Sequence, residues 1–146
     1  MNVTTSYNLG TLAKQASTVA ITSSETDMLV VTDTKYPEKS QLTLYLDVDL
    51  TAGQATSVNF RVYFTYLVAP ASVVWYPINP VNAGTGVLTD LPYIVSSATY
   101  SYSTTKYRTV LDIPMSACTG FKVTATGVGG TGAGTLAKIT AVVRDN

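Results

Sequence analysis

Two aspartates separated by one residue form the pair whose spacing best suits chemistry. Asp47 and Asp49 alternate with the apolar residues of 42–50, so on a strand they share one face at a separation of about 7 Å. Carboxylates so placed are typical of general acid–base catalysis or of half a calcium site, and Asp33 and Glu38 are close in sequence. We favour a solvent-facing or oligomer-facing pair, and calcium binding stays open.

The segment from Gly127 to Gly132 fits the letters G-x-G-x-x-G of a dinucleotide-binding loop. That motif needs a helix whose N-terminus meets the pyrophosphate, whereas the residues that follow here have the alternation of a strand. We therefore predict a wide hairpin connection in which glycine supplies a positive φ. The single cysteine, Cys118, is predicted to be a small buried residue.

Other site chemistries are excluded by what the sequence lacks. It contains no histidine and one cysteine, which rules out Ser-His-Asp or Cys-His catalysis, an intrachain disulfide and a thiolate zinc site. Nine basic and nine acidic residues are dispersed along the chain, so it lacks the basic surface of a nucleic-acid-binding protein. No apolar run approaches the about 18 residues needed to cross a membrane. We expect no enzymatic activity, no cofactor and no metal site.

Aromatic residues gather in the middle of the chain, among loops rich in proline and glycine. Such side chains stack on sugar rings in carbohydrate-binding modules, anchor protein interfaces, or pack in a core. All three interpretations remain open for the members of this group, which are Trp75, Tyr76, Tyr93, Tyr100, Tyr102 and Tyr107.

The elements that position these residues are predicted to be strands. The 146 residues include 24 Thr, 18 Val and 10 Tyr but only 2 Glu, a composition that suits pleated sheets rather than helices. Apolar residues alternate with polar ones over 42–50 and again over 59–66, which predicts two long antiparallel strands, either a hairpin or Greek-key neighbours. Further strands are predicted at 17–22, 28–32, 73–76, 87–91, 93–95, 100–103, 108–113, 121–126 and 138–144.

This pattern predicts an all-β protein, an antiparallel β-sandwich or small barrel, with a jelly roll as the favoured form. Residues 1–16 are polar without strand periodicity and are predicted to be a short irregular N-terminal arm, with a helical turn at 12–16 as an option. Residues 17–146 then form one β-sandwich domain. The predicted core is Leu42, Leu44, Leu46, Val48, Phe60, Val62, Phe64, Leu111, Ile113, Phe121, Val123, Ile139 and Val143.

The C-terminal third carries a resemblance to a known group of proteins. The run from Ala117 to Gly127 (ACTGFKVTATG), the glycine-rich turn and the run from Ala137 to Arg144 (AKITAVVR) look like the closing strands of small jelly-roll virion proteins of tailed bacteriophages. The segment from Tyr36 to Ser40, before the leucine strand, is similar to that group too. The resemblance implies a virion accessory protein, such as a capsid decoration (cement) protein or a neck or tail component, without catalytic residues.

A structural role in a virion is therefore the expected function. The expected protein is a capsid decoration protein, most simply a homotrimer, that binds the major capsid protein or another virion protein and stabilises the shell between capsomers. The alternative is a tail- or neck-associated β-sandwich that binds a glycan or receptor. A low charge content with a positive mean hydropathy favours surfaces that are covered by other subunits. The predicted partner-binding residues are Tyr7, Leu9 and Leu12 in the arm, and Trp75, Tyr76, Tyr100 and Tyr102 in the aromatic group.

Overall fold

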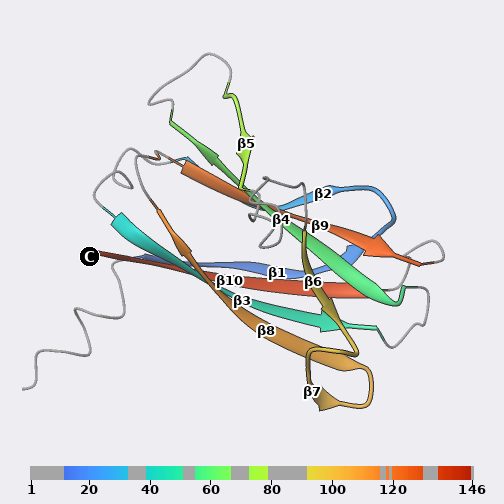
Figure 1. Ribbon diagram of the computed structural model, residues 1–146. Coiled ribbons are helices and arrows are strands. Elements are labelled where there is room, and N and C mark those ends of the chain that lie inside the picture. The colour runs from blue at the N-terminus through green and yellow to red at the C-terminus, as the bar shows by residue number, and fades with distance from the viewer. Residues whose placement is uncertain are drawn as a thin grey trace, which may run out of the picture.

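A computed structural model describes residues 12–32, 39–50, 55–66, 73–78, 92–115, 118, 120–129 and 135–145. These residues form two antiparallel sheets that pack face to face, and none of them is helical (Figure 1). Sheet A has the order β1 (Leu12–Ile21), β10 (Thr135–Asp145), β3 (Lys39–Asp49), β8 (Lys106–Pro114) and β7 (Tyr100–Ser103). Sheet B has the order β2 (Thr26–Thr32), β9 (Gly120–Val128) and β4 (Ser57–Thr65), with β5 (Tyr76–Pro77) and β6 (Tyr93–Ser96) both on the far edge of β4.

The strand order is that of a jelly roll. Apart from β5 and β7, the strands fall into the rows β1-β10-β3-β8 and β2-β9-β4-β6. When these eight strands are counted along the chain, the rows read 1-8-3-6 and 2-7-4-5, the double Greek key of the jelly roll. The predicted fold class is confirmed. Of the two arrangements offered for the long strands, the Greek-key one is right, because β3 and β4 lie in opposite sheets.

Alternation along the strands builds the core between the sheets. On β3 the four residues Leu42, Leu44, Leu46 and Val48 are buried, and each inward position pairs with an inward position of a neighbouring strand. Eleven of the thirteen predicted core residues are buried; Phe64 and Leu111 are only partly buried and pack against the edge of the core. Cys118 is buried, as predicted; core residues that the sequence did not single out are Ile21, Met28, Val31, Ala55, Val58, Val95, Met115, Ala125, Ala137 and Ala141.

The N-terminal boundary differs from the prediction. Strand β1 begins at Leu12, not at residue 17, so residues 12–16 belong to the sandwich as a strand and not to an irregular arm or a helical turn. Between Ala16 and Val19 the chain advances three residues while the partner strand advances two, from Ile139 to Ala137. A bulge of this kind interrupts the alternation of side chains, which explains why one period-two pattern does not run through the segment.

The glycine-rich connection after β9 contains one backbone conformation that needs glycine. Gly129 has a φ of +94°, and a Cβ atom at this position would lie 3.0 Å from Oγ1 and 3.2 Å from the backbone nitrogen of Thr56. The predicted positive φ is therefore confirmed at Gly129. The predicted hairpin is wrong, because β9 and β10 lie in different sheets and the connection crosses the sandwich. A strand follows it, so the helix that a dinucleotide loop requires is missing from this place.

Replacing Gly129 with alanine should lower the free energy of unfolding by about 1–2 kcal/mol, because a side chain in the left-handed region is strained and would meet Thr56. Urea denaturation followed by tryptophan fluorescence measures the change. The control is Val128→Ala, which truncates an exposed side chain in the same segment and should cost less. Equal unfolding midpoints for Gly129→Ala and the unmodified chain would show that the turn does not hold this conformation.

Candidate functional site

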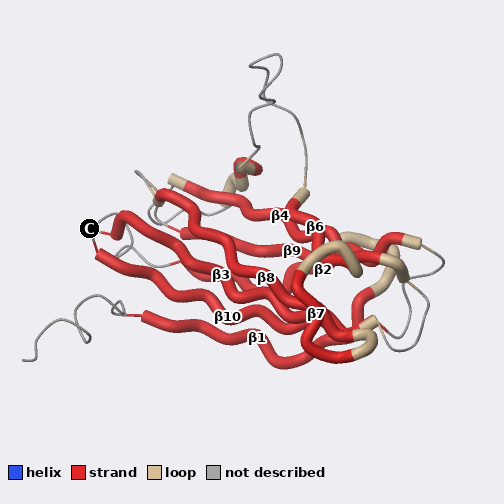
Figure 2. Tube along the Cα trace, turned by 60° about the horizontal axis from the view of Figure 1, so that its bottom comes forward, coloured by secondary structure: helices blue, strands red, loops and turns tan. Residues whose placement is uncertain are grey.

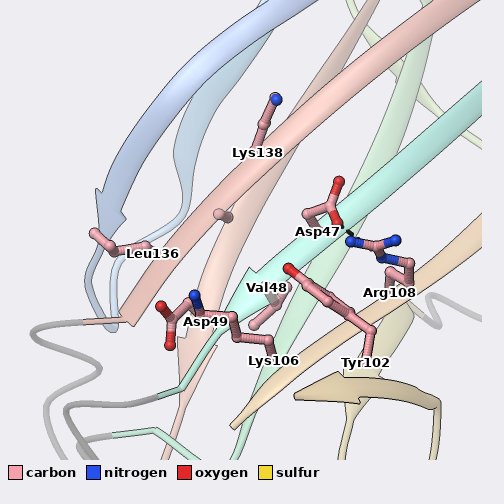
Figure 3. Close-up of a pocket in the computed structure, with 9 residues that line it drawn as sticks. Asp47, Val48, Asp49, Tyr102, Lys106, Arg108, Leu136 and Lys138 are labelled. Atoms are coloured by element: carbon pink, nitrogen blue, oxygen red, sulfur yellow. Dashed lines mark ion pairs between the residues drawn. The ribbon is translucent and has the colours of Figure 1, made fainter.

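An open pocket of about 280 Å³ lies on the outer face of sheet A, across β10, β3, β8 and β7 (Figure 3). It lies at the end of the sheet where β3 finishes and β8 begins. Three of the nine basic residues of the chain and two of its nine acidic residues line it. The lining consists of Asp47, Val48, Asp49, Tyr102, Lys106, Arg108, Leu136, Ala137 and Lys138.

Strand register brings these charges together. Asp47 of the central strand β3 lies opposite Arg108 of β8 on one side and opposite Lys138 of β10 on the other. One step along, Asp49 pairs with Lys106 and with Leu136 in the same way. Directly opposed residues on neighbouring strands have adjacent side chains. The two aspartates therefore share one face, as their spacing predicts, and each has a cationic residue as a direct neighbour.

The guanidinium of Arg108 is held in a defined position. Its Nε lies 3.2 Å from Oδ1 of Asp47, and its Cζ lies 3.4 Å from the centre of the Tyr102 ring. A hydrogen bond with Tyr102 and, less strongly, the charge of Asp47 raise the pKa of Arg108. Exposed ion pairs add little to stability, so the consequence of this arrangement is orientation: Arg108 lies over an aromatic wall of the pocket (Figure 3).

The surroundings of the two aspartates argue against calcium. Oδ1 of Asp49 accepts a hydrogen bond from Oγ1 of Thr105 at 3.5 Å, and Asp47 is paired with Arg108. Three cationic side chains line the same pocket and oppose a divalent cation by charge repulsion. Within the described residues, no group of three or more acidic, cysteine or histidine residues is placed to hold a metal ion.

The predicted partner-binding residues fall in separate places. Trp75 and Tyr76 lie at β5, beside the end of β4, whereas Tyr100 and Tyr102 lie on β7 at the edge of sheet A, and Figure 1 shows β5 and β7 far apart. The structure thus joins Tyr102, but not Trp75 or Tyr76, to the charged pocket. Tyr7 and Leu9 lie outside the described residues. Leu12 is the first residue of β1 and pairs with Val143 of β10.

Four residues form a second surface on the outer face of sheet B, which we call the sheet B surface: Val30, Tyr63, Trp75 and Lys122. The Nζ of Lys122 lies 4.8 Å from the Tyr63 ring centre, 5.4 Å from that of Trp75 and 3.6 Å from Oδ1 of Asp27. Tyr76 pairs with Phe64, whose side chain packs against the core, so Tyr76 lies on the other side of sheet B at its edge. The rings of Tyr66 and Tyr76 are 5.7 Å apart there, and a hydrogen bond between them raises the pKa of Tyr76. Tyr66 is 58% and Tyr76 48% exposed.

Two other members of the aromatic group belong to the core. Tyr93 and Tyr107 are partly buried and pack against the buried cluster between the sheets. Burial raises the pKa of Tyr93. The core interpretation is therefore right for these two tyrosines, while Tyr76, Tyr100 and Tyr102 are exposed.

A carboxylate that sequence reasoning missed ties the turn between β1 and β2 to sheet B. Oε2 of Glu25 accepts hydrogen bonds from the hydroxyl of Tyr63 at 2.8 Å and from Oγ1 of Thr124 at 3.0 Å, and lies 3.8 Å from Nε of Arg61. These contacts span β4 and β9. In the sequence Glu25 is one of two acids, with Asp27, in the polar segment between two strands, a pattern typical of solvated residues, so no local signal marks it.

The thiol of Cys118 is buried, as predicted, and burial raises its pKa to about 11. The thiol form is therefore kept in the folded protein, and Cys118 should react with iodoacetamide at pH 8 much more slowly than in urea. Because the unfolded thiol ionises at a lower pH, near the ordinary value of 9.0, stability should fall as the pH rises above that value. Mass spectrometry of the alkylated protein measures the reaction, and equal rates with and without urea would contradict the burial.

Comparison with known proteins adds little to the geometry. No family model matches the chain, and no curated protein matches it. The solved structures include a similar one described as "Structure of infectious bursal disease virus Gx strain", with a TM-score of 0.29 and 14% identity. The match covers 97% of this chain and 30% of that one, so this chain spans about a third of the matched chain's length. A TM-score this low carries no argument, and the fold assignment rests on the strand order. Among the described residues, none lies in a helix that is long and apolar enough to cross a membrane.

Proposed function

We propose that the chain is a structural protein of a virion, and specifically a capsid decoration protein that binds between capsomers and stabilises the shell. The observation that carries the proposal is the sheet B surface. Val30 is 50% exposed and pairs in register with Lys122, which pairs in turn with Tyr63. Tyrosine and tryptophan side chains, such as Tyr63 and Trp75 beside Val30, are enriched in protein interfaces.

The jelly-roll sandwich suits this role because its sheets expose broad faces. No described element covers the outer face of either sheet (Figure 2). Charged residues make up 12% of the chain, about half the usual share, and five of them line the pocket on sheet A. On sheet B the outward positions of β4 and β9 include Ser57 and Thr126, and hydroxyl groups cost less to desolvate than charges when a partner covers them.

The proposal includes a homo-oligomer, most simply a trimer, and an N-terminal segment that contacts a neighbouring subunit or the shell. Because residues 12–15 pair with β10, a deletion that tests the segment should end at Thr11 and remove Tyr7 and Leu9. We expect the shortened chain to keep its unfolding midpoint and to bind shells more weakly. Full affinity after the deletion would exclude the contact. Light scattering at micromolar concentration should give the mass of an oligomer, and a monomer mass would exclude it.

The decisive experiment measures the chain in virions. Particles purified from infected cells should contain it in a fixed, high ratio to the major capsid protein, and particles that lack it should assemble but open at a lower temperature. A few copies per particle would support the tail or neck alternative and exclude the decoration role. Absence from the particles would exclude both.

A matched pair of variants tests which face binds. Val30→Ser removes an exposed apolar side chain of the sheet B surface, and Val110→Ser removes an equally exposed one from the outer face of sheet A. We expect Val30→Ser to weaken rebinding to shells that lack the protein, and Val110→Ser to leave it unchanged. Equal affinities for the two variants would show that the sheet B surface is not the contact.

A further inference from the structure

The charged pocket on sheet A has the lining of a ligand site that the assembly role does not use. We propose that it binds a monosaccharide unit carrying one carboxylate group, such as a uronic or sialic acid. The pocket lies on the opposite face of the sandwich from the sheet B surface. Sugar binding and shell binding can therefore be tested independently, and the failure of one does not exclude the other.

The requirement for an anion comes from two lysines. Lys106 and Lys138 line the pocket (Figure 3), and among the residues that the structure describes no carboxylate lies within ion-pair distance of either ammonium group. The third cation, Arg108, is already paired with Asp47. A ligand carboxylate placed between the strands offers the lysines the charge-assisted hydrogen bonds that they lack.

The two aspartates restrict the ligand further. Asp47 and Asp49 accept hydrogen bonds but repel negative charge, so a polyanion such as a nucleic acid or a sulfated polymer meets repulsion as well as attraction. A ligand with one carboxylate and several hydroxyl groups offers hydrogen-bonding partners to both the lysines and the aspartates of the pocket. Its acid faces the lysines, and its hydroxyls donate to the aspartate oxygens.

Size and shape fit one sugar ring. A volume of about 280 Å³ lies just below the range of about 300–1,000 Å³ for drug-sized ligands, which suits one ring and not an extended chain. Tyr102 and Leu136 add apolar surface at the two sides of the pocket, against which the C–H groups of a pyranose pack. Arg108 is held by Asp47 and Tyr102 before any ligand arrives, so less ordering is needed on binding.

The test is a titration of the full-length, isotope-labelled chain followed by amide NMR shifts, with sodium glucuronate and N-acetylneuraminate as probes. At least one probe should shift amides around Asp47, Lys106 and Lys138 in a saturable manner. Glucose and acetate are the control ligands: glucose has no carboxylate for the lysines, and acetate has no hydroxyl groups for the aspartates. Each should therefore bind about tenfold more weakly than the acidic sugar, since each lacks one set of charge-assisted hydrogen bonds. Acetate that binds as tightly as the sugars would reduce the pocket to a general anion site and overturn the proposal.

Variants distinguish the pocket from a general effect of charge. Lys106→Gln and Lys138→Gln should each raise Kd about tenfold. Lys39→Gln removes the same charge from the other end of β3 and should leave Kd unchanged. Equal effects of all three substitutions, or no saturable shift with either acidic sugar, would overturn the proposal. Light scattering of each variant reports assembly independently of the sugar.

Discussion

Replacing Phe60 with alanine should lower the free energy of unfolding by about 3–5 kcal/mol. Phe60 has no exposed surface and is among the largest fully buried side chains of the structure. It lies on β4 between Ala125 of β9 and Tyr93 of β6, in the middle of sheet B. Neighbours that are fixed in pleated strands collapse into the space only in part, so most of the cavity should remain. A loss of this size is a large share of the about 5–15 kcal/mol that stabilises a typical domain.

The matched control is Phe64→Ala on the same strand, four residues further along. Both side chains point to the inner face, but Phe64 is only partly buried, so its loss should cost less than half as much. Chemical denaturation with a common slope measures both values. If Phe64→Ala costs as much as Phe60→Ala, the end of the sandwich beside β5 is more tightly packed than the structure shows.

Phe64 also shows how far alternation in a sequence predicts a core. A period of two assigns each side chain to the inner or outer face, and that assignment is right for Phe60, Val62 and Phe64 alike. It does not say where along a strand the facing sheet ends, because that depends on elements distant in the sequence. Leu111 on β8 was likewise assigned to the inner face, and it packs against the core while only partly buried.

Only part of the charged pocket could be predicted from the sequence. The shared face of Asp47 and Asp49 follows from two-residue spacing alone. Their cationic neighbours come from β8 and β10, about 60 and 90 residues further along the chain, and no local pattern fixes the register of such distant strands. The aspartates were predicted to be a solvent-facing or oligomer-facing pair with calcium binding left open, and the structure places them among three cationic side chains in one pocket.

Backbone irregularities also limit how much of the fold can be predicted from the sequence. The bulge between Ala16 and Val19 breaks the alternation of β1, so residues 12–16, which begin this strand, were predicted to belong to an irregular arm. Gly129 was found because glycine reports a backbone conformation directly. A bulge has no comparable signature among residues as ordinary as Ser17 and Thr18.

Replacing Glu25 with alanine should lower the free energy of unfolding by about 2–3 kcal/mol, although the residue lies in an exposed turn. The reason is Thr124, which is 1% exposed and donates its hydroxyl hydrogen bond to Glu25. Without the carboxylate this buried donor loses its partner, at a cost of about 1–3 kcal/mol. The hydrogen bond from Tyr63 is lost as well. The turn between β1 and β2 is then held to sheet B by fewer contacts, chiefly the backbone hydrogen bond from Gly127 to the carbonyl of Thr22.

Two variants in the same turn and partner strand make the test specific. Ser24→Ala leaves the backbone contacts of the turn in place, because the hydrogen bonds of Ser24 use its main-chain N–H and carbonyl, and it should change stability little. Thr124→Val removes the hydroxyl while keeping the shape of the side chain, so in that background Glu25→Ala should cost about 1 kcal/mol, the value of the remaining hydrogen bond. A double-mutant cycle by urea denaturation measures the coupling. Strictly additive losses would show that the carboxylate of Glu25 and the hydroxyl of Thr124 do not interact in solution.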